Sequence, residues 1–204
     1  MKKSLFVLSF CIFGILFLFN TKPVYASLGS ITYWESDSNT IGRWTSVPRT
    51  SHETINGFTN NNFLSYVNHA RNQWRSAGIS ISSTSTNANL MFYGGNRTAL
   101  VLREPALSPH YAAMTVWRSV SREGYWDQRG TRRTGNKISR ADIYIVYESG
   151  RSTAQYRNLS THELGHALGW YGHTTRGSSN VMYDTMTSIT NLTTYDKRHL
   201  GQVY

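Results

Sequence analysis

The chain has 204 residues, a formal net charge of +10 at pH 7 and one cysteine, Cys11. This length suffices for one domain with a sizeable core. A single cysteine excludes disulfide-stapled folds and cysteine-ligated zinc modules, so any metal site must use His, Asp or Glu. Because no nucleic-acid-binding module accompanies the positive charge, we expect no nucleic-acid partner.

The first 26 residues have the features of a secretory signal peptide. A short basic start precedes an apolar run from Leu5 to Phe19, and small side chains at Val24 and Ala26 mark a cleavage site. The run has about 15 residues, whereas a membrane-spanning helix needs about 20. We expect a signal peptide over 1–26 and a secreted, extracellular, monomeric domain without a membrane span over 27–204. A retained membrane anchor is the alternative interpretation.

The first part of this domain is expected to contain two strands, near Ile31–Trp34 and Gly42–Val47, followed by a loop. Apolar residues then recur every three or four positions, which predicts an amphipathic helix over Asn60–Gly78. Thr59 or one of the three asparagines that follow it can cap this helix, and Gly78 can end it.

Further strands are expected at Ile79–Ser83, Asn89–Tyr93, Tyr111–Val120 and Ile138–Tyr147. Gly94-Gly95 should end the second of these strands. A helix is expected from about Asn158, as its N-cap, to Trp170, and a short last helix over Thr194–Val203. Strands and helices in this order indicate an α+β fold, in which helices cover a mixed sheet.

The stretch Thr161–His173 contains the pattern H-E-x-x-H. His162 and His166 are four residues apart, so on a helix they lie on one face and can bind one Zn²⁺. Glu163 lies beside that face, where it can hold a water molecule on the metal. Zinc with an open coordination position lowers the pKa of its water to about 7, and a carboxylate can then take the proton. The pattern therefore indicates metal-assisted peptide hydrolysis.

The third ligand must come from downstream, where no glutamate follows Glu163. The remaining donors are His173, Asp184, Asp196 and His199. His173 is the nearest, and Gly169 and Gly172 allow the chain to turn back toward the metal. We expect His173 to complete a three-histidine zinc site, with Asp184 as the main alternative.

These residues resemble the metzincin family of zinc metalloproteases. His162 to Gly169 match its H-E-x-x-H-x-x-G signature, and Ser179–Tyr183 is similar to its Met-turn. Leu192–Tyr204 resembles the final helix of the matrixin-like branch. The resemblance is close over 158–204 and topological over 30–150. It implies a zincin-like α+β fold with a mixed twisted sheet, an active-site helix and a C-terminal helix.

The resemblance also implies a function, a secreted zinc-dependent endopeptidase whose substrate is a protein or peptide. Glu163 would activate a zinc-bound water, and Met182 would form a hydrophobic floor under the imidazoles. Tyr183 could hydrogen-bond a developing oxyanion, or line the substrate pocket. The chain departs from the family in one respect. Three residues separate Gly169 from His173, where the family has two.

Two other functions fit the same residues. A zinc hydrolase acting on cell-wall peptides is compatible with secretion and with the basic stretch from Arg118 to Arg140. A non-catalytic secreted zinc-binding protein or toxin is the other, although a structural zinc site does not need Glu163. The sequence allows calcium as a further ion but has no loop signature for it, and no His/Asp cluster in 80–140 indicates a second zinc. The remaining histidines that we expect to be surface or core residues are His52, His69, His110 and His199.

Overall fold

The structure is a computed structural model and describes residues 34–126 and 131–204. The predicted signal peptide lies outside these residues, as does most of the strand expected near Ile31–Trp34; Trp34 itself is not in a strand. The described residues form six strands and four helices. In chain order they are β1 (Gly42–Trp44), β2 (Arg49–Ile55), α1 (Asn60–Arg75), β3 (Ser82–Ser83), β4 (Leu90–Asn96), α2 (Arg97–Arg103), β5 (Ala113–Trp126), β6 (Arg132–Tyr147), α3 (Thr153–Ala167) and α4 (Thr194–Gly201).

The six strands form one mixed sheet, as the sequence predicted. Strands β3, β2, β4 and β6 lie side by side and are parallel, and β1 pairs in parallel with the first part of β6. Strand β5 lies on the other edge of β6 and is antiparallel to it. The molecule is therefore a mixed α/β structure with a mostly parallel sheet, which is compatible with an α+β fold.

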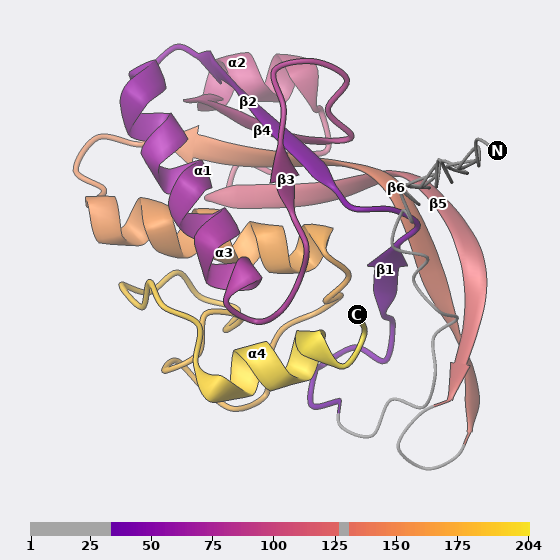
Figure 1. Cartoon of the computed structure of the whole chain (residues 1–204). Coiled ribbons are helices and arrows are strands. Elements are labelled where there is room, and N and C mark those ends of the chain that lie inside the picture. Colours follow the sequence, from indigo (N-terminus) through magenta and orange to yellow (C-terminus); the bar gives the residue numbers. More distant parts are fainter. Residues whose placement is uncertain (1–33, 127–130) are drawn as a thin grey trace, which may run out of the picture.

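Helices cover both faces of the sheet (Figure 1). Helices α1 and α3 lie against one face and α2 against the other. Side chains along β6 alternate accordingly, because successive residues of a strand point to opposite faces. Ile143 and Ile145 join the main core under α1 and α3, while Tyr144 and Val146 join the smaller core under α2.

Helix α1 confirms the predicted amphipathic helix. The Thr59 side chain caps it by accepting a hydrogen bond from Asn62 N, and Gly78 follows its end with a φ of 85°. Its buried stripe runs from Phe63 to Trp74. Trp74 Nε1 donates to the Thr161 carbonyl oxygen at 2.8 Å, which joins α1 to α3 in the core.

Two expectations for the first strands are wrong. The segment expected to be a loop contains β2, whose sequence is mostly polar and whose structure comes from pairing with β4. The strand expected to end at Gly94-Gly95 continues to Asn96 and stays paired with β6. Gly94 serves a packing role, because the Phe63 ring of α1 lies where its side chain would be. Helix α2 was not predicted either.

Helix α3 begins earlier and ends earlier than predicted. Its N-cap is Ser152, which forms a capping box with Gln155. Asn158, the predicted N-cap, lies inside the helix. Its amide nitrogen donates to the Ile189 carbonyl oxygen at 2.7 Å, and its Oδ1 accepts from Thr187 N at 3.1 Å. Asn158 therefore anchors the long loop between α3 and α4.

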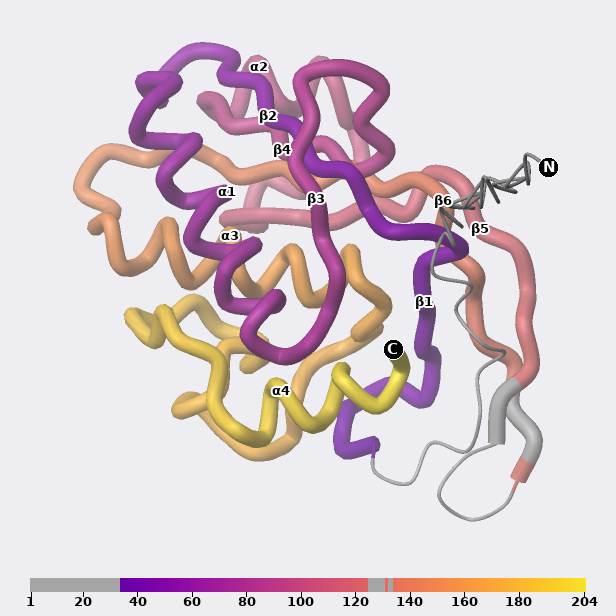
Figure 2. Tube along the Cα trace, viewed as in Figure 1, coloured from indigo at the N-terminus to yellow at the C-terminus, as the bar shows by residue number. Residues whose placement is uncertain are grey.

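Helix α4 confirms the short helix predicted at the C-terminus, with Thr193 as its N-cap. Figure 2 shows the chain before β1 running close to this last part of the molecule. Tyr195 OH donates to the Glu35 carbonyl oxygen at 2.8 Å. Residues more than 150 positions apart are thus adjacent, next to the loop that carries His173.

Candidate metal centre

Three histidine side chains come together where α3 passes into the following loop. His162 and His166 lie one turn apart on α3, and His173 comes from the loop. One ring nitrogen from each histidine lies within 4.8 Å of the other two. Three imidazoles at these distances can bind one metal ion.

The nitrogens of His162 and His166 that face each other carry no proton. His162 Nδ1 lies 2.8 Å from the Val181 carbonyl oxygen, and His166 Nδ1 lies 2.6 Å from that of Trp170. A carbonyl oxygen only accepts hydrogen bonds, so each Nδ1 must be the protonated nitrogen of a neutral ring. The two unprotonated Nε2 atoms are 2.9 Å apart. Their lone pairs repel unless a cation lies between them.

This spacing lets both nitrogens bind one metal ion. Two nitrogens bound at about 2.0–2.1 Å in a tetrahedral arrangement are roughly 3.3 Å apart, so a tetrahedral ion requires the two rings to move slightly apart from the observed 2.9 Å. Burial lowers the pKa of His162 to about 4, and it also lowers the pKa of His166 well below its usual value. Both rings are therefore neutral near pH 7, the form that binds metals.

Glu163 is buried beside the histidines and contacts the edge strand β5. Thr115 Oγ1 lies 2.7 Å from Glu163 Oε2 and 2.9 Å from the Glu163 carbonyl oxygen. Burial raises the pKa of Glu163 to about 7, and the Thr115 hydrogen bond opposes this shift. Two residues further along β5, Trp117 Nε1 donates to the His166 carbonyl oxygen at 3.0 Å. Strand β5 is thus held against the metal-binding turn of α3.

Met182 packs against α3 at Gly165, the residue before His166. Its side chain is fully buried, and a Cβ atom built on Gly165 would lie 2.4 Å from its sulfur atom. Backbone hydrogen bonds hold the turn around it. The Val181 carbonyl accepts from the first histidine, and the buried Asp196 carboxylate accepts from Val181 N at 3.3 Å. Thr174 N donates to the Met182 carbonyl oxygen at 2.8 Å.

The chain leaves α3 through a glycine turn. Gly169 has a φ of 119°, its N–H donates to the His166 carbonyl, and Trp170 N donates to the Gly165 carbonyl. These two bonds form a Schellman motif, which satisfies carbonyls at the helix end. The Gly169 carbonyl accepts from Gly42 N at 2.8 Å, so the turn also contacts β1. The turn expected at Gly169 is confirmed.

A second turn brings His173 to the site. Gly172 has a φ of 75°, and a Cβ atom on it would lie 2.1 Å from Asp37 Oδ1. The same oxygen accepts from His173 N at 2.6 Å, and Asp37 Oδ2 lies 3.5 Å from His173 Nδ1. The extra residue of the loop is therefore accommodated by a left-handed glycine packed against an aspartate.

The other residues singled out from the sequence lie elsewhere. Asp184 is exposed, its Oδ1 accepts from Thr185 Oγ1 at 3.2 Å, and it is not in the histidine group. His52 Nε2 lies 2.9 Å from Asn60 Oδ1. His69 Nε2 lies 2.7 Å from the Thr190 carbonyl oxygen. His199 is buried between Trp34 and Trp170, and His110 is exposed. Tyr183 is half-buried.

Sequence reasoning missed three residues that contact the site, namely Asp37, Thr115 and Trp117. Asp37 stands in a polar segment without periodicity, and the two β5 residues looked like ordinary residues of an edge strand. The only available signal for Asp37 was indirect. A glycine immediately before the third histidine suggests a crowded turn, but it does not identify the neighbour.

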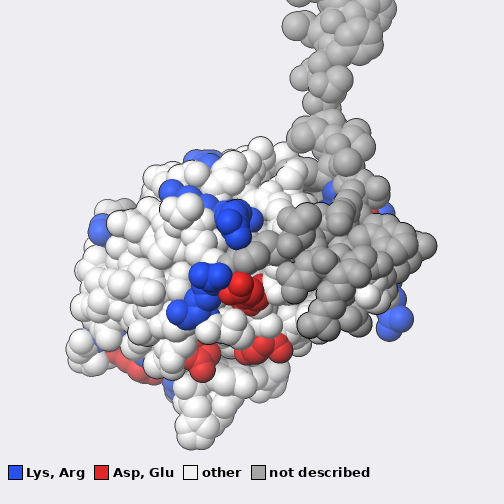
Figure 3. Space-filling view, turned by 90° about the horizontal axis from the view of Figure 1, so that it is seen from below, with Lys and Arg blue, Asp and Glu red and all other residues white. Residues whose placement is uncertain are grey.

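The basic stretch from Arg118 to Arg140 is partly neutralised by acids. Arg118 pairs with Asp142 at 2.7 Å and with Glu104, and Lys137 Nζ lies 3.7 Å from Glu123 Oε1. Arg129 lies outside the described residues. On the face seen in Figure 3, basic and acidic side chains lie next to one another and most of the surface is uncharged. Among the described residues visible on that face, charges of one sign form no large patch.

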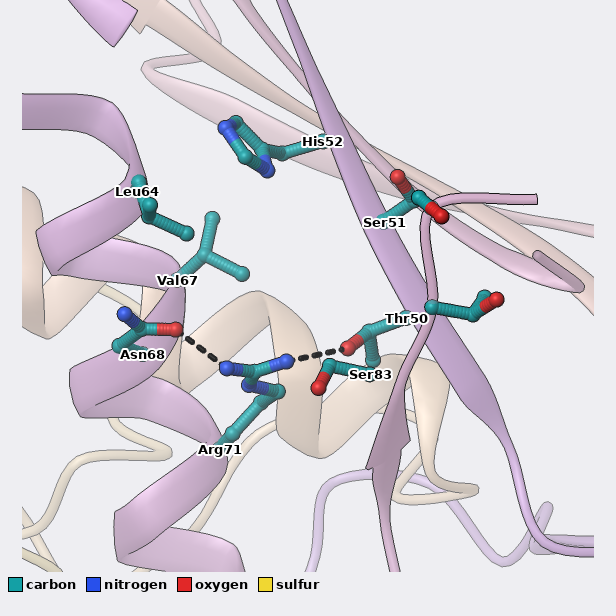
Figure 4. A pocket seen from close by; sticks show the side chains of 10 residues that line it. Thr50, Ser51, His52, Leu64, Val67, Asn68, Arg71 and Ser83 are labelled. Atoms are coloured by element: carbon teal, nitrogen blue, oxygen red, sulfur yellow. Dashed lines mark hydrogen bonds between the residues drawn. The ribbon is translucent and has the colours of Figure 1, made fainter. Parts of the chain in front are cut away.

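A groove of about 550 Å³ lies between α1 and the strands β2 and β3 (Figure 4). Leu64 and Val67 form part of its wall, and Arg71 points into it. The Arg71 guanidinium donates to Thr50 Oγ1 at 3.1 Å and to Asn68 Oδ1. None of the three clustered histidines lines this groove.

No protein-family model matches this chain, and no curated protein sequence matches it. Among the described helices, none combines the length and apolar character that crossing a bilayer requires. We therefore infer a function from the geometry of the histidine cluster and its neighbours.

Proposed function

We propose that this protein is a secreted zinc-dependent endopeptidase of the metzincin type. The observation that carries the proposal is the buried carboxyl group of Glu163. This residue directly follows His162 on α3, and His162 is the first of the three clustered histidines. A structural metal site needs only its ligands. Burying a carboxyl group beside such a site costs free energy of folding, and a role in peptide hydrolysis would explain why the group is there.

The donor set supports zinc as the metal. His162, His166 and His173 offer three neutral imidazoles, and three protein ligands leave one tetrahedral position open. Imidazole suits zinc, and three histidines form a known catalytic zinc ligand set. When bound, Zn²⁺ would supply Lewis acidity to a water molecule and to the scissile carbonyl.

The protein's own groups would move the protons. Glu163 would take a proton from the attacking water and pass it to the leaving amine. Burial raises the pKa of Glu163 to about 7 in the metal-free protein, and a zinc ion nearby would lower it again and favour the charged carboxylate, the form that accepts a proton. The Thr115 hydroxyl, 2.7 Å from Oε2, would keep the carboxyl group in one orientation.

Strand β5 supports an extended peptide as substrate. One edge of β5 pairs with β6, and in the described part of the chain no strand pairs with its other edge. Thr115 and Trp117 join this strand to the metal-binding turn of α3. A peptide that added to the free edge as a further strand would therefore pass beside the histidines.

Glu163→Gln is the test. We expect the variant to bind one zinc ion with wild-type affinity and to lose at least about 100-fold in cleavage rate, the usual contribution of a general base. Glu148→Gln, which removes an acid from the surface, is the matched control and should cleave normally. Casein, gelatin and cell-wall peptide fragments should be offered in parallel, with and without a chelator. Undiminished cleavage by Glu163→Gln would refute the assignment.

A further inference from the structure

The loop that carries His173 is held by a segment at the start of the described chain. Asp37 N donates to the His173 carbonyl oxygen at 3.0 Å, and Asp37 Oδ1 accepts from His173 N at 2.6 Å. Ser36 Oγ donates to the Tyr171 carbonyl oxygen at 3.0 Å, and Ser36 forms a β-bridge with Thr174. The segment thus binds the backbone on both sides of the histidine.

We propose that Asp37 is a positioning residue for the third metal ligand, orienting His173 through its backbone and its ring at once. The inference rests on the proposed metal site. One carboxylate oxygen holds the His173 N–H, and the other faces His173 Nδ1 at 3.5 Å. A carboxylate only accepts hydrogen bonds, so it favours the tautomer with the proton on Nδ1. That tautomer leaves Nε2 as the unprotonated nitrogen.

Each of the three histidines would then have its own acceptor behind it. His162 and His166 use the backbone carbonyls of Val181 and Trp170. His173 uses a side chain from a different part of the sequence. Such outer partners fix the tautomer and ring orientation of metal-binding histidines, and removing one typically weakens metal binding 10–100-fold.

The loop has a specific need for this support. His166 is placed by α3, whereas His173 follows two glycines with left-handed backbone and a loop one residue longer than the metzincin pattern. The left-handed Gly172 leaves the space that Asp37 Oδ1 occupies, because a Cβ there would lie 2.1 Å from that oxygen. The longer loop and the aspartate therefore depend on each other, because Asp37 fits against the loop only where residue 172 has no side chain.

The test measures zinc affinity by competition with a chromophoric chelator. Asp37→Asn keeps an oxygen for the His173 N–H but removes the charge. Its zinc Kd should rise about 10-fold, the lower end of the usual range, because the Asp37 side chain is 56% exposed. Glu35→Gln is the matched control. It removes a carboxylate from the same segment, one that pairs with Arg176, and should leave the zinc Kd unchanged.

A double-mutant cycle separates positioning from general destabilisation. In a His173→Ala background, Asp37→Asn should change the zinc Kd by less than about twofold, because Asp37 acts on the metal only through the His173 ring, which this background lacks. The absorption spectrum of bound Co²⁺ should shift in Asp37→Asn and not in Glu35→Gln. An equal loss of affinity in both backgrounds, or no loss in either, would overturn the proposal.

The readouts require no catalysis, so they hold even if the protein cleaves no peptide. Wild-type zinc affinity in His173→Ala itself would refute the three-histidine site and this inference with it. Normal zinc binding by a protein without peptidase activity would refute the proposed function alone.

Discussion

Gly169→Ala tests how strictly the chain's exit from α3 depends on glycine. Gly169 has a φ of 119°, and its carbonyl oxygen accepts from Gly42 N at 2.8 Å. A Cβ atom at this position would lie 1.8 Å from the Gly42 carbonyl oxygen and 2.4 Å from its carbonyl carbon. These are backbone atoms of β1, and unlike the end of a flexible side chain they cannot move away without moving the strand. The helix end, the strand or both must move.

The expected loss of stability has three contributions. A residue with a side chain held at such a φ costs about 1–3 kcal/mol. Forcing extra atoms into a packed site costs about 1–3 kcal/mol. Loss of the hydrogen bond from Gly42 N adds about 0.5–1.5 kcal/mol. We therefore expect a decrease of roughly 2.5–7.5 kcal/mol in the free energy of unfolding, a large part of the ~5–15 kcal/mol typical of a domain.

Urea denaturation of the metal-free protein measures this loss, and Gly177→Ala is the matched control. Gly177 has a similar left-handed backbone, with a φ of 90°, but nothing lies within 4 Å of its would-be Cβ. The control should lose only the backbone cost of about 1–3 kcal/mol. If both variants lose the same free energy, the close approach of Gly42 to Gly169 has no energetic importance and the reasoning fails.

Two further predictions concern the metal loop and acid stability. In Gly172→Ala the new Cβ would lie 2.1 Å from Asp37 Oδ1 and 2.7 Å from Ser38 Cβ, so both the aspartate and its backbone segment must move. Zinc affinity should fall about 10-fold, and stability should lose about 1–3 kcal/mol for the strained backbone and about 1–3 kcal/mol for the overpacking. Unchanged zinc affinity would contradict this. Burial lowers the pKa of His199 to about 3; Arg176 and Arg198 lower it further, and Glu35 opposes the shift. Between pH 6.5 and 3 the unfolded chain therefore binds a proton at this residue that the folded protein does not bind. Stability should therefore fall with decreasing pH by up to about 1.4 kcal/mol per unit from this residue. His199→Phe keeps an aromatic ring between Trp34 and Trp170, so its free energy of unfolding should decrease less as the pH falls. If the wild type and the variant lose stability in parallel over this pH range, His199 is not the cause of the acid sensitivity.

Local sequence was sufficient where one short stretch contains the whole signal. The amphipathic stripe of α1 and the short helix α4 are of this kind, since helix signals lie within a few residues of each other. The spacing of His162, His166 and His173 predicted a cluster, and the structure brings those three rings together. The left-handed exit at Gly169 was also readable, because few other residues adopt that backbone.

Elements whose signals lie in their partners could not be predicted. Strand β2 is polar and is a strand because β4 supplies its hydrogen bonds. Gly94 looked like a strand end, but it makes room for the Phe63 ring from α1. Asn158 looked like a helix cap, but inside α3 its side chain binds the loop around Ile189. In each case a contact distant in sequence decided between two locally acceptable structures.

The sequence by itself determined which residues can bind a metal, because ligand chemistry and helical spacing are local properties. Tertiary structure decided what surrounds them. Asp37 reaches His173 across more than 130 residues, and Thr115 reaches Glu163 from the edge strand. The physical reason is that a hydrogen bond depends on distance in space, and chain folding alone brings such partners within 3 Å.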